Sequence, residues 1–263
     1  MKTVLVLAPH PDDAEFFAGG TLARFAREGA RVVLVVASDG RRGSFQEEPE
    51  TLAARRAEEA RRAAAVLGAE PPILLGHPDL ELDLLPAGLL RQQFVRAIRE
   101  FRPDVVFAPD PLAPDPHPDH RAVAHASSDA IHFAGLPLLY PEQVAAGLEP
   151  HFVVEKYFYG ENLPAANHVV DIGATMELKI AAMAEHRSQV EFLVEDVLRQ
   201  ARLAGLDMGT LLGTGPADPL ALLAWALKIQ AAEIGRRSGL AFGEAFRYAR
   251  FHPLVESLLE QAK

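Results

Sequence analysis

Short apolar runs rich in valine alternate with longer stretches of helical spacing through the first half of the chain. The apolar runs that read as strands are residues 3–8, 31–37, 73–76 and 104–108. The stretches with the apolar period of a helix are residues 15–28, 49–67 and 89–101. This alternation is typical of parallel strands joined by right-handed helical crossovers. It predicts an α/β fold with a doubly wound, mostly parallel, Rossmann-like sheet whose core follows the strand order 3-2-1-4.

The pattern is less regular after residue 135. Residues 136–150 contain Pro137, Pro141 and Pro150 and are predicted to form a loop. Further strands are predicted at 152–159 and 168–172, and further helices at 175–185, 190–204 and 219–237. Residues 208–218, rich in glycine and threonine, are typical of a mobile loop over the site. Because no linker is evident, we predict a single domain over 1–263, with a core at 1–135 and a C-terminal helical and strand elaboration at 136–263.

Composition excludes several classes of protein. With 26 basic and 36 acidic residues the net charge is −10, which argues against broad binding to nucleic acid. Cysteine is absent, so a transition metal would have to be held by His, Asp or Glu. The longest apolar run, Leu220 to Leu227, is far shorter than the roughly 20 residues that span a bilayer. The N-terminus carries no positively charged leader, and a cytoplasmic location is therefore expected.

Two clusters of histidine and aspartate follow predicted strands. His10-Pro11-Asp12-Asp13 comes after the first strand, and His117-Pro118-Asp119-His120 comes after the fourth. In the predicted strand order these two strands are neighbours, so their following loops would face one crevice. Three imidazole and carboxylate ligands with one open position suit a catalytic zinc ion, and a spare carboxylate nearby can act as a base.

Each residue of these clusters also has a plain structural interpretation. An aspartate here can be a helix N-cap, and a histidine can be an ordinary loop residue. Adjacent Asp12 and Asp13 cannot easily point the same way, so one is expected to bind the metal while the other faces the water. His117 and His120 both reach the site only if a helix begins between them, in which case one can bind metal and the other can address the substrate carbonyl.

The same segments resemble the PIG-L/LmbE-like family of zinc-dependent N-deacetylases, which remove acetyl groups from N-acetylglucosamine-type amides. The resemblance is carried by PHPDDAE at 9–15 and HPDH at 117–120, and it extends to RPDVVFAP at 102–109, EHRSQ at 185–189 and GEAFRY at 243–248. It implies a metal-dependent amide hydrolase that acts on carbon–nitrogen bonds other than peptide bonds.

The resemblance also implies a role for individual residues. His10, Asp13 and His120 would be the metal ligands, with Zn²⁺ as the expected ion and Fe²⁺ as an alternative. Asp12 would be the general base that activates the water.

His117 would stabilise the oxyanion and protonate the departing amine, with Asp119 orienting it or tuning its pKa. Arg56 and Asp115 occupy positions of substrate contacts in the family, although a surface arginine and a plain loop residue are the alternatives.

The substrate implied is a small N-acetylated amino sugar. Segments such as FVVEKYFY at 152–159 resemble most closely the enzymes that deacetylate GlcNAc-malate on the way to bacillithiol, and arginines in the loop at 38–43 suggest an anionic aglycone. The alternatives are deacetylation of chitin-derived sugars, amide cleavage in a thiol conjugate, and a non-catalytic metal- or sugar-binding protein, against which Asp12 and His117 argue. A nucleotide-binding domain is rejected because the first turn lacks G-x-G-x-x-G. A homo-oligomer is expected, through residues 136–150 and the apolar C-terminal helices.

Overall fold

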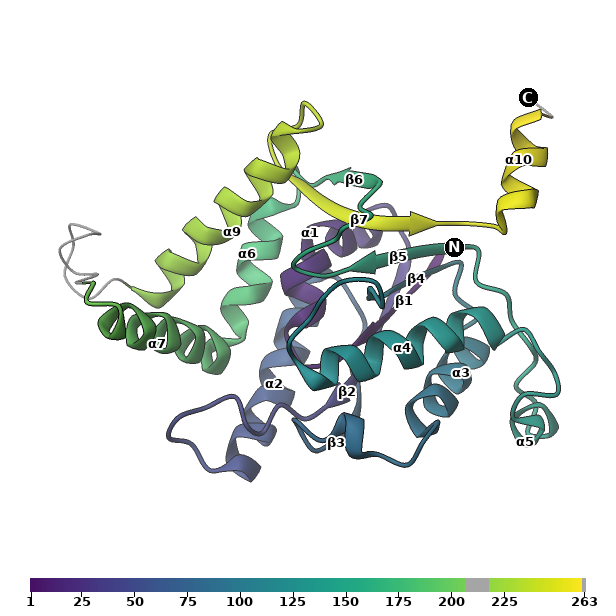
Figure 1. The fold of residues 1–263 in the computed structure, drawn as a ribbon, viewed down its shortest axis with the longest axis horizontal. Helices are drawn as coiled ribbons and strands as arrows, with labels where there is room; N and C mark the ends of the chain where they lie inside the picture. Colours follow the sequence, from purple (N-terminus) through teal and green to yellow (C-terminus); the bar gives the residue numbers. More distant parts are fainter. Residues whose placement is uncertain (207–217, 262–263) are drawn as a thin grey trace.

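A computed structural model describes residues 1–206 and 218–261 of the protein. Within this part of the chain the strands form one seven-stranded sheet in the order β3-β2-β1-β4-β5-β7-β6 (Figure 1). Strands β1 to β5 run parallel to one another, and β7 is antiparallel to both β5 and β6. The predicted α/β class and the 3-2-1-4 core are therefore confirmed.

The element bounds follow the predicted ones closely in the first half of the chain. The strands are β1 (Thr3–Ala8), β2 (Arg31–Ser38), β3 (Ile73–His77), β4 (Val105–Pro109), β5 (Glu155–Tyr159), β6 (His168–Asp171) and β7 (Gly243–Ala249). The helices are α1 (Asp13–Arg27), α2 (Pro49–Leu67), α3 (Leu89–Phe101), α4 (Pro118–Phe133), α5 (Pro141–Ala145), α6 (Met176–Glu185), α7 (Arg187–Leu203), α9 (Pro219–Arg236) and α10 (Pro253–Gln261), with a 3₁₀ turn η1 at Leu82–Leu84.

Strand β1 is the centre of the fold because helices cover both faces of the sheet. Leu5 and Leu7 point to the side of α3 and α4, while Val4 and Val6 point to the side of α1, α2 and α6. All four side chains have no exposed surface. A strand buried on both faces reads as a continuous apolar run, which is why the sequence of β1 shows no polar alternation.

The C-terminal half differs from its prediction in three places. Strand β7 was not predicted, and it joins the sheet beside β5, so that the last part of the chain completes the same sheet as the first. Its sequence, GEAFRYA, carries two charged residues and lacks a clear apolar period. The segment at 136–150 was predicted as a loop but contains the short helix α5. The predicted strand at 152–159 is shorter and begins only at Glu155, and nearly all of the predicted loop at 208–218 lies outside the described residues.

Several large apolar side chains are exposed where an oligomer interface was predicted. Leu138 is 89% exposed and Phe152 72% exposed near the segment 136–150. Helix α10, which projects away from the body of the fold in Figure 1, exposes 65% of Leu254 and 55% of Leu258. The homo-oligomer itself stays a prediction. Among the described helices none is both long and apolar enough to cross a membrane.

Candidate metal centre and active site

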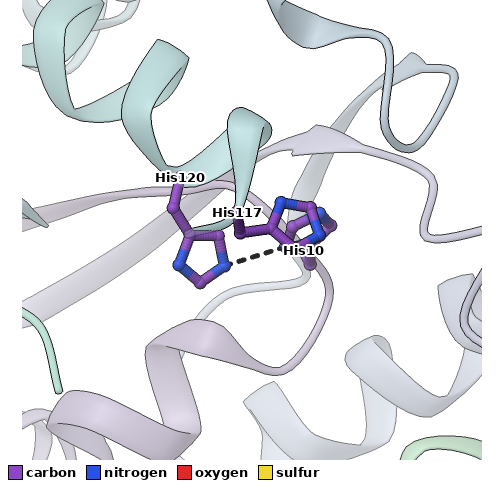
Figure 2. Close-up of side chains that lie close together, drawn as sticks. All are labelled: His10, His117 and His120. Atoms are coloured by element: carbon purple, nitrogen blue, oxygen red, sulfur yellow. Dashed lines mark hydrogen bonds between the residues drawn. The ribbon is translucent and has the colours of Figure 1, made fainter. Parts of the chain in front are cut away.

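The two histidine and aspartate clusters meet because β1 and β4 are adjacent strands. Val4 pairs with Val105 and Val6 with Phe107, so the two parallel strands end side by side. His10 lies two residues beyond β1, and α4 begins at Pro118 after the loop that follows β4. The helix thus starts between His117 and His120, as the shared site requires. Figure 2 shows His120 directed from α4 toward His10, with His117 beside them.

Potential ligand atoms of three side chains lie close to one another. Nδ1 of His10 is 3.2 Å from Oδ2 of Asp13 and 3.2 Å from Nε2 of His120. Nε2 of His120 is 3.4 Å from Oδ1 of Asp13. A tetrahedral ion bonded at about 2.0–2.1 Å holds its ligand atoms about 3.3–3.4 Å apart. Two imidazoles and one carboxylate at this spacing fit a divalent transition metal.

Carboxylates hold the outer nitrogens of both imidazoles. Nδ1 of His120 is 2.8 Å from Oδ2 of Asp115. Nε2 of His10 lies 3.1 Å from Oδ1 of Asp79 and 3.2 Å from Oδ2 of Asp119. Such partners orient a metal-binding histidine and raise its basicity. They therefore point Nδ1 of His10 and Nε2 of His120 toward the same position.

Other groupings of the same side chains are also close. His10, His117 and His120 have ligand atoms within 4.8 Å of one another, as do His10, Asp79 and Asp119. The second grouping is less suited to a cation because Asp119 already accepts the backbone N–H groups of Leu80 and Leu82. His117 is engaged by the N-terminus of α4. In the grouping of His10, Asp13 and His120 the donor atoms lie 3.2–3.4 Å apart, and the backbone N–H of His10 bonds to Oδ2 of Asp13 and not to Oδ1.

The charges around the site favour a cation. Burial alone would lower the pKa of His120, but Asp13 and Asp115 raise it to about 10. Burial would also lower the pKa of His10, but its contacts with Asp119, Asp13 and Asp79 raise that pKa well above the ordinary value. Both imidazoles thus retain protons because the carboxylates around them attract positive charge. A divalent ion would supply that charge instead.

The pKa of His117 is shifted in the opposite direction from the pKa values of His10 and His120. Burial lowers its pKa below the ordinary value, and the neighbouring His10 and His120 lower it further. Its Nδ1 accepts the backbone N–H of Asp119 at 3.2 Å and so caps α4. A neutral imidazole that accepts at Nδ1 carries its proton on Nε2. The fold therefore presents His117 as a neutral donor.

Asp12 occupies the N-cap position of α1, but its side chain makes no capping hydrogen bond. Its Oδ1 instead accepts from Nη2 of Arg56 at 3.0 Å. Burial raises the pKa of Asp12 above the ordinary value, while the charge of Arg56 opposes that rise. Asp12 is thus not a simple helix cap, and it adjoins the candidate ligand Asp13 in the chain.

Three of the predicted site residues have partners that differ from those expected. The carboxylate of Asp119 lies against His10 rather than His117, and Asp119 reaches His117 only through its backbone N–H. Asp115 contacts His120. Arg56 is only 2% exposed, on the inner side of α2. The loop arginines also have acidic partners, since Arg41 pairs with Asp39 and Glu50, and Arg42 pairs with Glu81.

Asp79 is the member of the site that sequence reasoning missed. It is 4% exposed and follows β3. A signal was present, because His77-Pro78-Asp79 is a third His-Pro-Asp tripeptide at the end of a strand. Its histidine, however, bonds to Gln93 and does not join the site.

A cavity of about 460 Å³ opens beside the site. Asp115 and His120 form part of its wall, and Phe17, Tyr159 and Arg121 form other parts. Its volume lies in the range of small-molecule sites. A ligand of the size of a small saccharide could therefore extend from the candidate metal position into this cavity.

The chain is similar to known de-N-acetylases. The family model described as PIG-L: GlcNAc-PI de-N-acetylase matches residues 5–131. The diacetylchitobiose deacetylase of Thermococcus kodakarensis is 38% identical over 192 residues, which cover 72% of this chain and 70% of that protein. A probable N-acetyl-α-D-glucosaminyl L-malate deacetylase 2 of Bacillus anthracis is 26% identical over 76% of this chain and 86% of its own length.

The likeness extends to solved structures. The N,N'-diacetylchitobiose deacetylase of Pyrococcus horikoshii, complexed with its inhibitor MPG, superposes with a TM-score of 0.78 at 30% identity. The match covers 95% of this chain and 84% of that one. The chain is accordingly an amide hydrolase that acts on carbon–nitrogen bonds other than peptide bonds, and it belongs to the PIG-L family of de-N-acetylases.

Proposed function

We propose that the protein removes the N-acetyl group from a small saccharide containing N-acetylglucosamine, with a divalent cation held by His10, Asp13 and His120. Zinc is the first candidate for that ion, and ferrous iron suits the same donors. The observation that carries the proposal is the spacing of 3.2–3.4 Å among Nδ1 of His10, Nε2 of His120 and the carboxylate oxygens of Asp13. Asp12 and His117 adjoin this set, and a protein that only binds metal needs neither.

The reaction is hydrolysis of an amide. When bound, the cation would supply Lewis acidity, which polarises the acetyl carbonyl and lowers the pKa of water. Asp12 takes a proton from the attacking water as the new carbon–oxygen bond forms. The carbon–nitrogen bond then breaks, and the proton held by Asp12 passes to the departing amine. The products are acetate and a free amino sugar.

His117 is suited to stabilise the oxyanion. Nδ1 of His117 accepts the backbone N–H at the start of α4, so the neutral ring carries its proton on Nε2. This N–H can donate a hydrogen bond to the negative charge that develops on the acetyl oxygen. The lowered pKa of His117 keeps the ring neutral near pH 7. A neutral donor is less suited to protonate the amine, so we assign that step to Asp12.

A neutral substrate of the chitin type is the first candidate. The arginines of the loop at 38–43, from which an anionic aglycone was inferred, pair with carboxylates of this chain. They are therefore not free to bind a second anion. The relative at 38% identity is named as a diacetylchitobiose deacetylase, which supports the same choice.

A GlcNAc-malate conjugate is the second candidate, and Arg121 is the observation that favours it. Arg121 lines the cavity beside His120. Its Nη1 donates to the carbonyl oxygens of Asp115 and Pro116, and no carboxylate among the described residues pairs with it. A malate group in the cavity would find its counter-charge there.

The test is release of amine from diacetylchitobiose and from GlcNAc-malate, before and after chelation and after return of Zn²⁺ or Fe²⁺. Metal-dependent turnover that prefers diacetylchitobiose supports the first candidate. A preference for GlcNAc-malate that Arg121→Ala abolishes by raising KM supports the second. If neither substrate releases amine from the metal-loaded protein, the proposed function is wrong.

A further inference from the structure

The backbone of Asp12 is strained. Its φ angle is +151° and its ψ angle −24°, a conformation that a residue with a side chain rarely adopts. Strain of this kind persists only where the surroundings impose it. The turn from His10 to Asp13 therefore needs an external restraint to hold the Asp12 carboxylate in place.

Arg56 contacts both the side chain of that strained residue and the carbonyl group that precedes it. Its Nη2 donates to the carbonyl oxygen of Pro11 at 3.1 Å and to Oδ1 of Asp12 at 3.0 Å. Its Nη1 donates to the carbonyl oxygen of Gly40 at 2.9 Å. The planar guanidinium thus links α2, the loop after β2 and the strained turn, which a single ammonium group cannot do.

The loop after β2 is shaped around this guanidinium. A Cβ atom at Gly40 would lie 2.3 Å from Nη1 of Arg56, and one at Gly43 would lie 3.0 Å from the same atom. Real Cβ atoms do not approach to 2.3 Å, so Gly40 leaves room for the arginine, whereas a Cβ at Gly43 would first meet the side-chain amide of Gln189 at 2.8 Å. An arginine on the surface of a helix would need no such enclosure.

We propose that Arg56 is a positioning residue that holds the strained Asp12 turn, and that it acts on the reaction through Asp12 rather than by contact with the substrate. The inference rests on the proposed function, in which Asp12 moves the proton. Its basis is the pair of contacts to Pro11 and Asp12 from a side chain only 2% exposed. With Oδ1 of Asp12 bonded to Arg56, Oδ2 is left to take the proton.

The first experiment separates kcat from KM. Arg56→Gln should lower kcat about 100-fold, the loss that a misplacement of about 1 Å can produce, while KM changes less than about twofold. Arg56→Lys should fall between this variant and the wild type. The matched control is Arg55→Lys on the same helix, because Arg55 is partly exposed and pairs with Glu47, Glu59 and Glu191. A raised KM with kcat intact for Arg56→Gln would mean direct contact with the substrate and would overturn the proposal.

A double-mutant cycle tests whether the loss of kcat in Arg56→Gln acts through Asp12. Once Asp12→Asn has removed the base, Arg56→Gln should lower kcat no further, because residues that act as a unit are not additive. Independent losses that multiply would contradict the proposal. Bound metal per chain should equal that of the wild type in all these variants, since the metal ligands are untouched.

A crystal structure of Arg56→Gln tests the inference apart from activity. Asp12 should leave its positive φ, or its carboxylate should move, whether or not any saccharide is a substrate. An unchanged Asp12 would overturn the inference even if the proposed function holds. If wild type releases no amine but the Asp12 turn relaxes in the variant, the function fails and the positioning role stands. Should Arg56→Gln not fold, Gly40→Ala displaces the guanidinium while keeping its charge, because the new Cβ would lie 2.3 Å from Nη1 of Arg56, and the same displacement of Asp12 is expected.

Discussion

The backbone N–H of Asp119 donates to Nδ1 of His117 at 3.2 Å, so the start of α4 sets the tautomer of the histidine that we propose as the oxyanion donor. The same contact caps the helix, which means that one hydrogen bond serves both the fold and the site. His117 can then present Nε2–H to the substrate without any further partner.

Replacement of His117 should therefore reduce kcat with little change in KM. We expect His117→Ala to lower kcat about 100- to 1000-fold, the loss typical of removing one oxyanion donor. Steady-state kinetics of amine release measures this. His132→Gln is the control on the same helix, because His132 is exposed and bonds only to the Ser128 carbonyl oxygen among its described contacts. A large rise in KM alone would assign His117 to substrate binding instead.

Asp12 should be needed for turnover but not for metal. Asp12→Asn keeps the shape of the side chain and removes its ability to take a proton, so kcat should fall about 100- to 10,000-fold. Metal per chain, measured by elemental analysis, should remain equal to that of the wild type. Turnover close to normal in this variant would contradict the assignment of the base.

The carboxylates behind the metal ligands should control metal affinity. Asp115→Asn weakens the partner of His120, and Asp79→Asn weakens a partner of His10. Each should reduce metal affinity about 10- to 100-fold, as is typical for outer partners of ligating histidines. Competition with a fluorescent chelator gives the affinity. Asp129→Asn is the control, since Asp129 is exposed and pairs with Arg91. Equal affinity in all three variants would show that the first two carboxylates have no such role.

Metal affinity should also rise with pH. The pKa of His120 is raised to about 10 from an ordinary 6.5 in the metal-free protein, and the pKa of His10 is raised as well. A cation must displace these protons, so affinity should increase by about tenfold per pH unit for each displaced proton between pH 6.5 and 10.

The stability of the metal-free protein should move in the opposite direction. A group whose pKa is raised by folding contributes stability below its unfolded pKa, and that contribution is lost as pH rises through the folded value. Tm of the metal-free protein should therefore fall between pH 6.5 and about 10, and His120→Gln should flatten this slope. Calorimetry measures the Tm, and a metal-free Tm that increased over this interval would contradict the proposed proton on His120.

The sequence alone was enough to predict the parallel core and the meeting of its two clusters. Strands buried on both faces appear in the sequence as continuous apolar runs such as residues 3–8, and amphipathic helices appear as apolar residues spaced three or four apart. The order of strands and helices can therefore be predicted from short stretches of sequence. Right-handed crossovers then made the first and fourth strands neighbours. The closeness of His10 and His120 follows from that topology.

The tertiary structure decided which groups surround these residues. Asp79 lies in the loop after β3, Arg56 lies on the buried face of α2, and β7 comes from the far end of the chain. The local hydrophobic pattern of the sequence predicts none of these placements. Asp119 illustrates the point, since its carboxylate turned to His10 and to the backbone of Leu80 instead of His117. Local pattern records which face of an element is buried, whereas the partner of a buried charge depends on what long-range packing brings within about 3 Å.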